Sequence, residues 1–167
     1  MNIEQLGRHI LVEYYNCDKE LLKNHQENQD SLKGILIMNI IIITGASSGM
    51  GVEFALQLDN VFTYTIDEIW MIARRKEAML EVAESMMNTT RILDMDVTKP
   101  EDMERLKKLL AKEKPTVRML VNCAGYGVMG EFSKLNVQEE LGMIDVNCKA
   151  LTQMTHMCIP YMRENSR

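Results

Sequence analysis

Several patterns that would assign a protein to a function class are scarce or missing in this 167-residue chain. Its four cysteines form no Cys-x-x-Cys pair and no Cys/His spacing of the kind that binds zinc, so we expect reduced thiols and no metal site. The N-terminus lacks a basic stretch followed by an apolar one, which argues against a secretory signal. Together these absences predict a cytoplasmic protein.

Positive charge and long apolar runs are equally scarce. The formal net charge of -5 gives the chain no basic surface, so nucleic acid is not an expected partner. The longest apolar run, residues 35–43, is interrupted by Asn39 and is roughly half as long as a membrane span requires. It therefore predicts a buried strand and no membrane partner. An apolar content of 46% with 26% charged residues is typical of a globular domain.

The chain changes character near residue 34. Residues 18–34 are polar and show no apolar periodicity, which is typical of a linker or a frayed helix. We therefore expect residues 1–34 to be an N-terminal extension outside the main domain. Beyond it, short apolar runs alternate with helical patterns. The expected strands are 35–44, 68–73, 91–97 and 118–123, and the expected helices are 48–58, 76–87, 101–113 and 137–162.

Strands that alternate with helices in this way are typical of βαβ units and a parallel sheet. Right-handed crossovers place helices on both faces of such a sheet. The predicted fold is therefore α/β, a Rossmann-type doubly wound parallel sheet that is truncated after about four strands. Residues 35–167 would form a partial dinucleotide-binding domain.

A loop rich in glycine and serine lies between the first expected strand and the first expected helix. Helix N-terminal amides and the positive end of the helix dipole suit a phosphate group, and glycines allow the backbone to approach it closely. The alternative is a glycine/serine turn without a ligand, but the strand–loop–helix context favours phosphate binding. The candidate residues are Gly45, Ser47, Ser48, Gly49, Met50 and Gly51.

The sequence TGASSGMG of this loop resembles the TGxxxGxG loop of the short-chain dehydrogenase/reductase family. Three further motifs follow in the family's order, and the first is Asp96-Val97, which closes the third expected strand. The second, Asn122-Cys123-Ala124-Gly125, is similar to the family's NNAG motif, with Cys123 in place of the second Asn. The third, Asp145-Val146-Asn147, is similar to the helix segment that carries the family's catalytic Asn. The resemblance covers residues 38–167.

This resemblance implies roles for the matching residues. Asp96 and Val97 would contact the adenine, and Ala124 and Gly125 would leave room for the adenosine ribose. Asn122 would belong to the cofactor site or tie adjacent strands through its amide. Asn147 would be the catalytic residue of a proton relay. As an alternative, Asp96 could cap the helix near Pro100, although Thr98 is better placed to do so.

The end of the second expected strand indicates which nicotinamide cofactor is used. An NAD site places a carboxylate there to hold the ribose 2′-OH. This chain has no acid at that point and continues with Arg74 and Arg75, whose planar guanidinium groups can pair with a 2′-phosphate. NADP is therefore the expected cofactor. The alternative is that the two arginines are solvated residues at the start of a surface helix.

The family's general acid/base is a Tyr four residues before a Lys, together with a Ser on the preceding strand. No Tyr-x-x-x-Lys follows the glycine loop in this chain. Tyr15 and Lys19 have this spacing but precede the loop, so we treat them as a coincidence. The resemblance thus implies an NADP-dependent oxidoreductase acting on a small-molecule carbonyl or alcohol, in a partial chain that is inactive alone. The alternative is a non-catalytic nucleotide-binding or interaction fragment.

Two weaker resemblances concern the N-terminal segment and the last expected helix. Residues 6–18 resemble the start of bacterial S-adenosylmethionine decarboxylase, and this resemblance implies that the segment is a remnant of a second protein. The alternative is that it is part of an ordinary N-terminal extension. The helix expected over residues 137–162 resembles one that the dehydrogenase family uses for subunit contact, so a homo-oligomer is possible through it.

Overall fold

The computed structural model describes residues 38–63 and 65–162. The predicted extension over residues 1–34, including the segment similar to a decarboxylase, lies outside these ranges. The elements in chain order are β1 (Asn39–Thr44), α2 (Met50–Val61), β2 (Glu68–Ala73), α3 (Lys76–Ala83), β3 (Thr90–Asp94), α4 (Pro100–Glu113), β4 (Thr116–Asn122), the 3-10 helix η1 (Phe132–Lys134), α5 (Val137–Ile144), the π-helical segment η2 (Asp145–Ala150) and α6 (Leu151–Met162).

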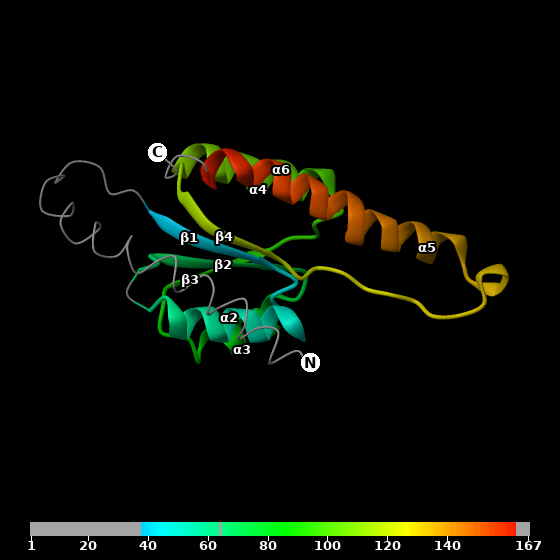
Figure 1. The fold of residues 1–167 in the computed structure, drawn as a ribbon, viewed down its shortest axis with the longest axis horizontal. Coiled ribbons are helices and arrows are strands. Elements are labelled where there is room, and N and C mark those ends of the chain that lie inside the picture. Colours follow the sequence, from blue (N-terminus) through cyan, green and yellow to red (C-terminus); the bar gives the residue numbers. More distant parts are fainter. Residues whose placement is uncertain (1–37, 64, 163–167) are drawn as a thin grey trace, which may run out of the picture. The chain divides into compact units, whose positions relative to one another are not determined.

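The four strands form one parallel sheet in the order β3-β2-β1-β4. Helices α2 and α3 cover one face of the sheet, and α4 and α6 cover the other (Figure 1). The chain first builds outward from β1 to β2 and β3, and then returns to place β4 on the opposite side of β1. This confirms the predicted Rossmann-type α/β fold.

The central strands are apolar because helices cover both of their faces. Ile40 to Ile43 of β1 are fully buried, and so are Ile69 to Met71 of β2. On the face of α4 and α6, the side chains of Ile42 and Trp70 join a core cluster that includes the buried residues Leu106, Leu110, Met154 and Cys158. β4 lies at one edge of the sheet, and most of its residues are only partly buried.

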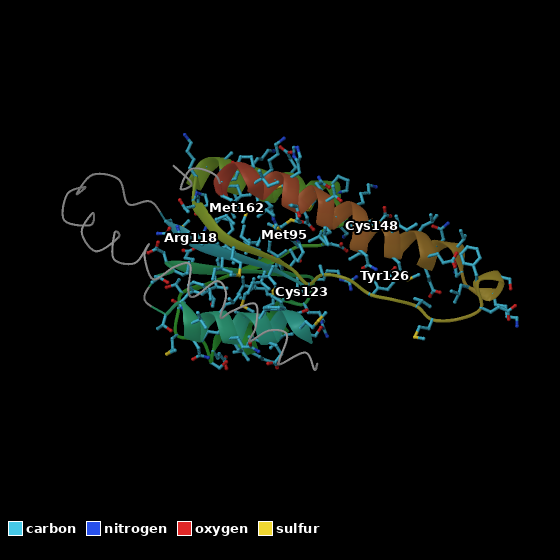
Figure 2. The ribbon with its side chains drawn as sticks, viewed as in Figure 1. Met95, Arg118, Cys123, Tyr126, Cys148 and Met162 are labelled. Atoms are coloured by element: carbon cyan, nitrogen blue, oxygen red, sulfur yellow. The ribbon has the colours of Figure 1, made fainter. Side chains whose placement is uncertain are left out.

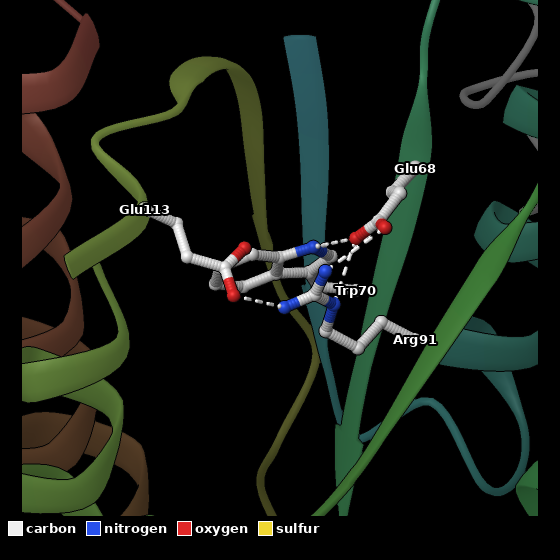
Figure 3. Close-up of polar contacts among 4 residues, drawn as sticks. All are labelled: Glu68, Trp70, Arg91 and Glu113. Carbon is white, nitrogen blue, oxygen red and sulfur yellow. Dashed lines mark hydrogen bonds and ion pairs between the residues drawn. The ribbon is translucent and has the colours of Figure 1, made fainter. Parts of the chain in front are cut away.

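A polar cluster joins β2, β3 and α4 beside this core (Figure 3). The guanidinium group of Arg91 lies over the ring of Trp70, 4.9 Å from the ring centroid. It forms ion pairs of 2.7 Å with Glu68 and of 2.7 Å with Glu113. The Trp70 indole N–H donates a 2.7 Å hydrogen bond to Glu68. One cation thereby connects three elements over an aromatic surface.

The expected ends of β3 and α3 are wrong. β3 ends at Asp94, so Asp96 and Val97 follow the strand and do not close it. α3 ends at Ala83 and not at residue 87. The reason is that the buried Asp59 carboxylate accepts hydrogen bonds from the amides of Met87 and Asn88, which draws the chain out of the helix.

The long helix expected over residues 137–162 is present but interrupted. Six residues, Asp145–Ala150, form a π-helical segment between α5 and α6. Of the apolar positions that predicted this helix, Met154 and Cys158 are buried, whereas Leu141 and Ile144 are 48% and 56% exposed. Burial raises the pKa of the Cys158 thiol to about 12. Only the α6 end of the pattern therefore packs on the sheet.

Candidate functional site

A cleft of about 520 Å³ lies at the carboxyl ends of the strands. This is where β1 has β2 on one side and β4 on the other, the point at which open α/β sheets bind their ligands. Eleven of the predicted site residues line the cleft: Gly45, Ser47, Ser48, Gly49, Met50, Arg74, Arg75, Asp96, Val97, Ala124 and Gly125. Gly51, Asn122 and Asn147 do not.

The glycine loop has the backbone form that its sequence predicts. Gly45 and Gly49 have φ values of 69° and 56°, which L side chains rarely adopt. A Cβ on Gly45 would also lie 2.6 Å from the carbonyl oxygen of Cys123, and one on Gly51 would collide with the carbonyl oxygen of Gly45. Gly51 is therefore a packing residue of the loop and not a wall of the cleft.

The loop leads directly into the N-terminus of α2, which opens at Met50. No side chain caps this helix end. Its first amides are thus available to an outside acceptor, and the helix dipole makes the position favourable for an anion. Around Gly49 the space that a Cβ would fill is open. These observations fit the diphosphate of a dinucleotide.

Thr44 connects the ends of β1 and β4. Its hydroxyl oxygen accepts hydrogen bonds of 3.1 Å and 3.1 Å from the amides of Cys123 and Ala124. Figure 2 shows Cys123 where β4 ends and Tyr126 farther along the chain toward α5. The Cys123 thiol is half-buried beside the cleft, and this burial raises its pKa. Thr44 thereby positions the segment that begins with Ala124 and Gly125.

The end of β2 brings two positive charges to the cleft. Arg75 donates hydrogen bonds to the Ser47 hydroxyl from Nε at 3.4 Å and from Nη2 at 3.3 Å. Its Nη2 also reaches the Ser47 carbonyl oxygen at 3.3 Å. Arg74 lines the same cleft. No acid stands at the end of this strand, and the two arginines follow its last residue, Ala73, directly.

Asp96 lies in the loop between β3 and α4. Partial burial alone would raise its pKa, but hydrogen bonds from the Thr98 hydroxyl and amide, with the positive charges of Arg74 and Lys99, lower it below its usual range. The amide of Asp96 donates a 2.9 Å hydrogen bond to Asp102. The expectation that Thr98 caps α4 is wrong. Lys99 holds the N-cap position without a side-chain bond, because the Thr98 hydroxyl donates to Asp96 instead.

Neither Asn147 nor Asn122 lines the cleft itself. Asn147, in the π-helical segment, accepts a 3.1 Å hydrogen bond from the Tyr126 amide and donates one of 2.8 Å to the Tyr126 carbonyl. Asn122 donates to the Thr155 hydroxyl at 3.2 Å, so its amide connects β4 to α6 and not to a neighbouring strand. Its Oδ1 is buried without a hydrogen-bond partner among the described residues.

Sequence reasoning did not select nine residues of the cleft. Six lie in strand ends or loops beside the selected residues, which is the signal that could have found them: Ile72, Ala73, Met95, Thr98, Cys123 and Tyr126. The other three lie in helical segments: Gly142 in α5, and Asp145 and Val146 in η2. Within residues 38–63 and 65–162 no three His, Cys, Asp or Glu side chains gather in a way that could hold a metal ion. In the same part of the chain, no helix is long and apolar enough to cross a membrane.

A glycine loop, an uncapped helix N-terminus and a cleft at the switch point of a parallel sheet define a dinucleotide-binding protein. The family model for short chain dehydrogenases matches residues 39–167, and the chain belongs to this family. Residues 6–18 lie outside the matched stretch.

Known relatives agree with this assignment. An uncharacterized oxidoreductase of Staphylococcus epidermidis is 25% identical over 127 residues, which cover 76% of this chain and 54% of the relative. The bulky-bulky ketone specific alcohol dehydrogenase from Comamonas testosteroni is 26% identical with a TM-score of 0.62, over 72% of this chain and 48% of that chain. Serine dehydrogenase from Escherichia coli is 27% identical with a TM-score of 0.62, over 76% and 57%. The chain thus spans about half the length of the relatives it matches.

Proposed function

We propose that this chain is the cofactor-binding part of an NADP-dependent oxidoreductase that transfers hydride between NADP(H) and a carbonyl or alcohol compound. The observation that carries the choice of NADP is the pair of arginines that follows β2 on the wall of the cleft, at a strand end that has no acid. A carboxylate at this point would repel a 2′-phosphate, whereas a guanidinium group forms charge-assisted hydrogen bonds with it.

The residues present suit each part of such a cofactor. The glycine loop and the N-terminus of α2 would hold the diphosphate, and Asp96 and Val97 would contact the adenine. Ala124 and Gly125 would leave room for the adenosine ribose. When bound, the nicotinamide would supply or accept the hydride. Asn147 fixes the backbone of Tyr126, which itself lines the cleft, and so shapes that wall.

Titration calorimetry of the purified chain with NADPH and with NADH tests this proposal. We expect NADPH to bind at least tenfold more tightly, since charge-assisted hydrogen bonds to one phosphate contribute about 1.5–3 kcal/mol. Raising the salt concentration should weaken NADPH more than NADH, because the extra interaction is electrostatic. Equal affinities for the two nucleotides would show that the arginines are only surface charge.

A second candidate function is a non-catalytic nucleotide-binding or interaction fragment. It is favoured by the apolar side chains between β4 and α5, where Met129 and Phe132 are 97% and 80% exposed. We propose self-association along residues 137–162 as one form of such an interaction, because Val137, Leu141 and Ile144 of α5 are also exposed. Light scattering of the chain and of Ile144→Glu tests it. The variant should have the mass of a monomer and the unchanged chain that of an oligomer.

A further inference from the structure

Arg74 and Arg75 are adjacent in the sequence but have different surroundings. Arg75 is the N-cap residue of α3 and has an extended backbone, with φ -99° and ψ 92°. Successive side chains diverge in an extended segment, so two neighbouring arginines there cannot easily serve one target. The two side chains therefore have different partners.

Arg75 is directed at the glycine loop. Its guanidinium group makes three contacts with Ser47, two with the hydroxyl and one with the carbonyl oxygen. Ser47 lies between Gly45 and Gly49, the two residues of this loop with positive φ. A segment between two glycines has few intrinsic restraints on its backbone. Within the described part of the chain, the backbone of this segment has one hydrogen bond to β2, a long one of 3.4 Å from the Ala46 amide to the Ile72 carbonyl.

Arg74 has no hydrogen bond or salt bridge with any of the described residues, and its side chain lines the cleft. Its positive charge acts on Asp96, whose pKa it helps to lower. Arg74 thus lies toward the part of the cleft where the loop after β3 contributes its residues. Its donors are not committed to the glycine loop and are available to a ligand.

We infer that Arg75 is a positioning residue that holds the phosphate-binding loop through Ser47. Of the two arginines in the proposed function, only Arg74 is then left to contact a 2′-phosphate. The inference rests on the proposed function, since both roles require a dinucleotide in the cleft. A loop already held in its binding form loses less conformational freedom when the ligand arrives. Because both nicotinamide cofactors carry the diphosphate, the effect of Arg75 should be the same for NADPH and NADH.

The test measures the dissociation constants of NADPH and NADH for Arg74→Ala, Arg75→Ala, Arg75→Lys, Ser47→Ala and the double variant of Ser47 and Arg75. For Arg74→Ala we expect NADPH to bind at least tenfold more weakly and NADH within twofold of the unchanged chain. For Arg75→Ala we expect both constants to rise by the same factor, about fivefold, as for the loss of one ordinary hydrogen bond. Arg75→Lys should restore part of the loss for both nucleotides.

The remaining variants identify how Arg75 acts. Ser47→Ala should have little further effect in a chain that already carries Arg75→Ala, because the two residues act through one contact. Lys76→Ala, the next exposed residue, is the matched control and should leave both constants unchanged. An Arg75→Ala chain that binds both nucleotides normally, or that loses its preference for NADPH, would overturn the inference. A chain without substitutions that binds neither nucleotide would refute the proposed function itself, and this inference with it.

Discussion

Gly51 shows how one missing side chain can determine whether the phosphate loop forms. A Cβ at this position would collide with the carbonyl oxygen of Gly45, a backbone atom that cannot turn away as a side chain can. We therefore expect Gly51→Ala to move the loop, to weaken NADPH binding at least tenfold and to destabilise the fold by about 1–3 kcal/mol. Calorimetry and urea unfolding measure the two effects.

Gly127→Ala is the matched control for Gly51→Ala. A Cβ on Gly127 meets nothing within 4 Å, and its backbone does not require glycine. We expect this variant to change the free energy of unfolding by less than about 0.5 kcal/mol. If the two alanines had equal effects, the collision with Gly45 would not be the cause.

Asp59 is a buried residue of α2 whose carboxylate binds the segment between α3 and β3. It is 3% exposed and accepts hydrogen bonds from the Met87 amide at 2.8 Å, the Asn88 amide at 2.8 Å and the Asn88 side chain at 2.7 Å. Removing the carboxylate leaves the amides of Met87 and of the buried Asn88 without this acceptor, whereas the Asn88 side chain keeps its 2.9 Å hydrogen bond to the Asp59 carbonyl oxygen. We expect Asp59→Ala to lower the free energy of unfolding by about 3 kcal/mol, measured by urea unfolding.

Glu53→Ala, an exposed acid on the same helix, is the control for Asp59 and should lie within about 0.5 kcal/mol of the unchanged chain. A similarly small change for Asp59→Ala would mean that water replaces the lost carboxylate. The sequence predicted neither the burial of Asp59 nor its partners, because a carboxylate between apolar residues of a helix has no periodicity that distinguishes it. Its partners are 28 and 29 positions away, and only the folded chain brings them together.

At the scale of elements, β3 depends on contacts made by Arg91. The hydrogen bond from Arg91 to Glu68 raises the pKa of the guanidinium group, and the bond to Glu113 acts in the same direction, although desolvation opposes them. The group therefore stays charged at any pH the fold survives. Its ion pairs are partly shielded from water, with side chains 28%, 18% and 22% exposed for Arg91, Glu68 and Glu113.

Arg91→Ala should destabilise the chain by about 1–2 kcal/mol, because it removes a stacked cation and two ion pairs that connect β2, β3 and α4. Arg91→Lys should recover less than half of this loss, since an ammonium group cannot serve both carboxylates and the ring at once. Lys108→Ala, whose 3.9 Å ion pair with Glu104 is exposed, should have almost no effect. Urea unfolding of the three variants decides the question.

Element types could be predicted from the sequence, but several ends could not. β2 has the predicted bounds because its apolar run is flanked by polar residues on both sides. β3 and α3 end early because side-chain hydrogen bonds compete with the local pattern: the Asp59 carboxylate binds the amide of Asn88, 29 residues away, and Asp102 binds the amide of Asp96. The π-helical segment was also not predictable, since one extra residue in a turn leaves the apolar spacing almost unchanged.

At the scale of the whole molecule, the sequence identified the cleft better than it identified the roles around it. The motifs located the loop, the β2 end and the β4 end because each has a strict backbone or charge requirement. The sequence could not predict that the Asn147 side chain forms hydrogen bonds with the backbone of Tyr126, or that Arg75 forms a hydrogen bond with Ser47. These contacts arise from packing between segments that are far apart in the chain. Family resemblance supplied residue roles, and the folded structure supplies their partners.

Turnover by this chain depends on a source of protons in the cleft. Hydride transfer to a carbonyl needs a proton donor, and general acids typically contribute about 10²–10⁴ in rate. The Tyr-x-x-x-Lys pair that performs this task in the family does not follow the glycine loop in this sequence. We therefore expect the chain to bind NADPH but not to use it to reduce aldehydes or ketones. With a panel of such compounds, its rate of NADPH oxidation should be no higher than the background rate of the Gly51→Ala variant. The measurement is the loss of NADPH absorbance with time. Turnover above that background, abolished by Asn147→Ala, would instead show that the residues around the cleft supply a proton by another route, with Asn147 and the Tyr126 backbone it holds as the first groups to test.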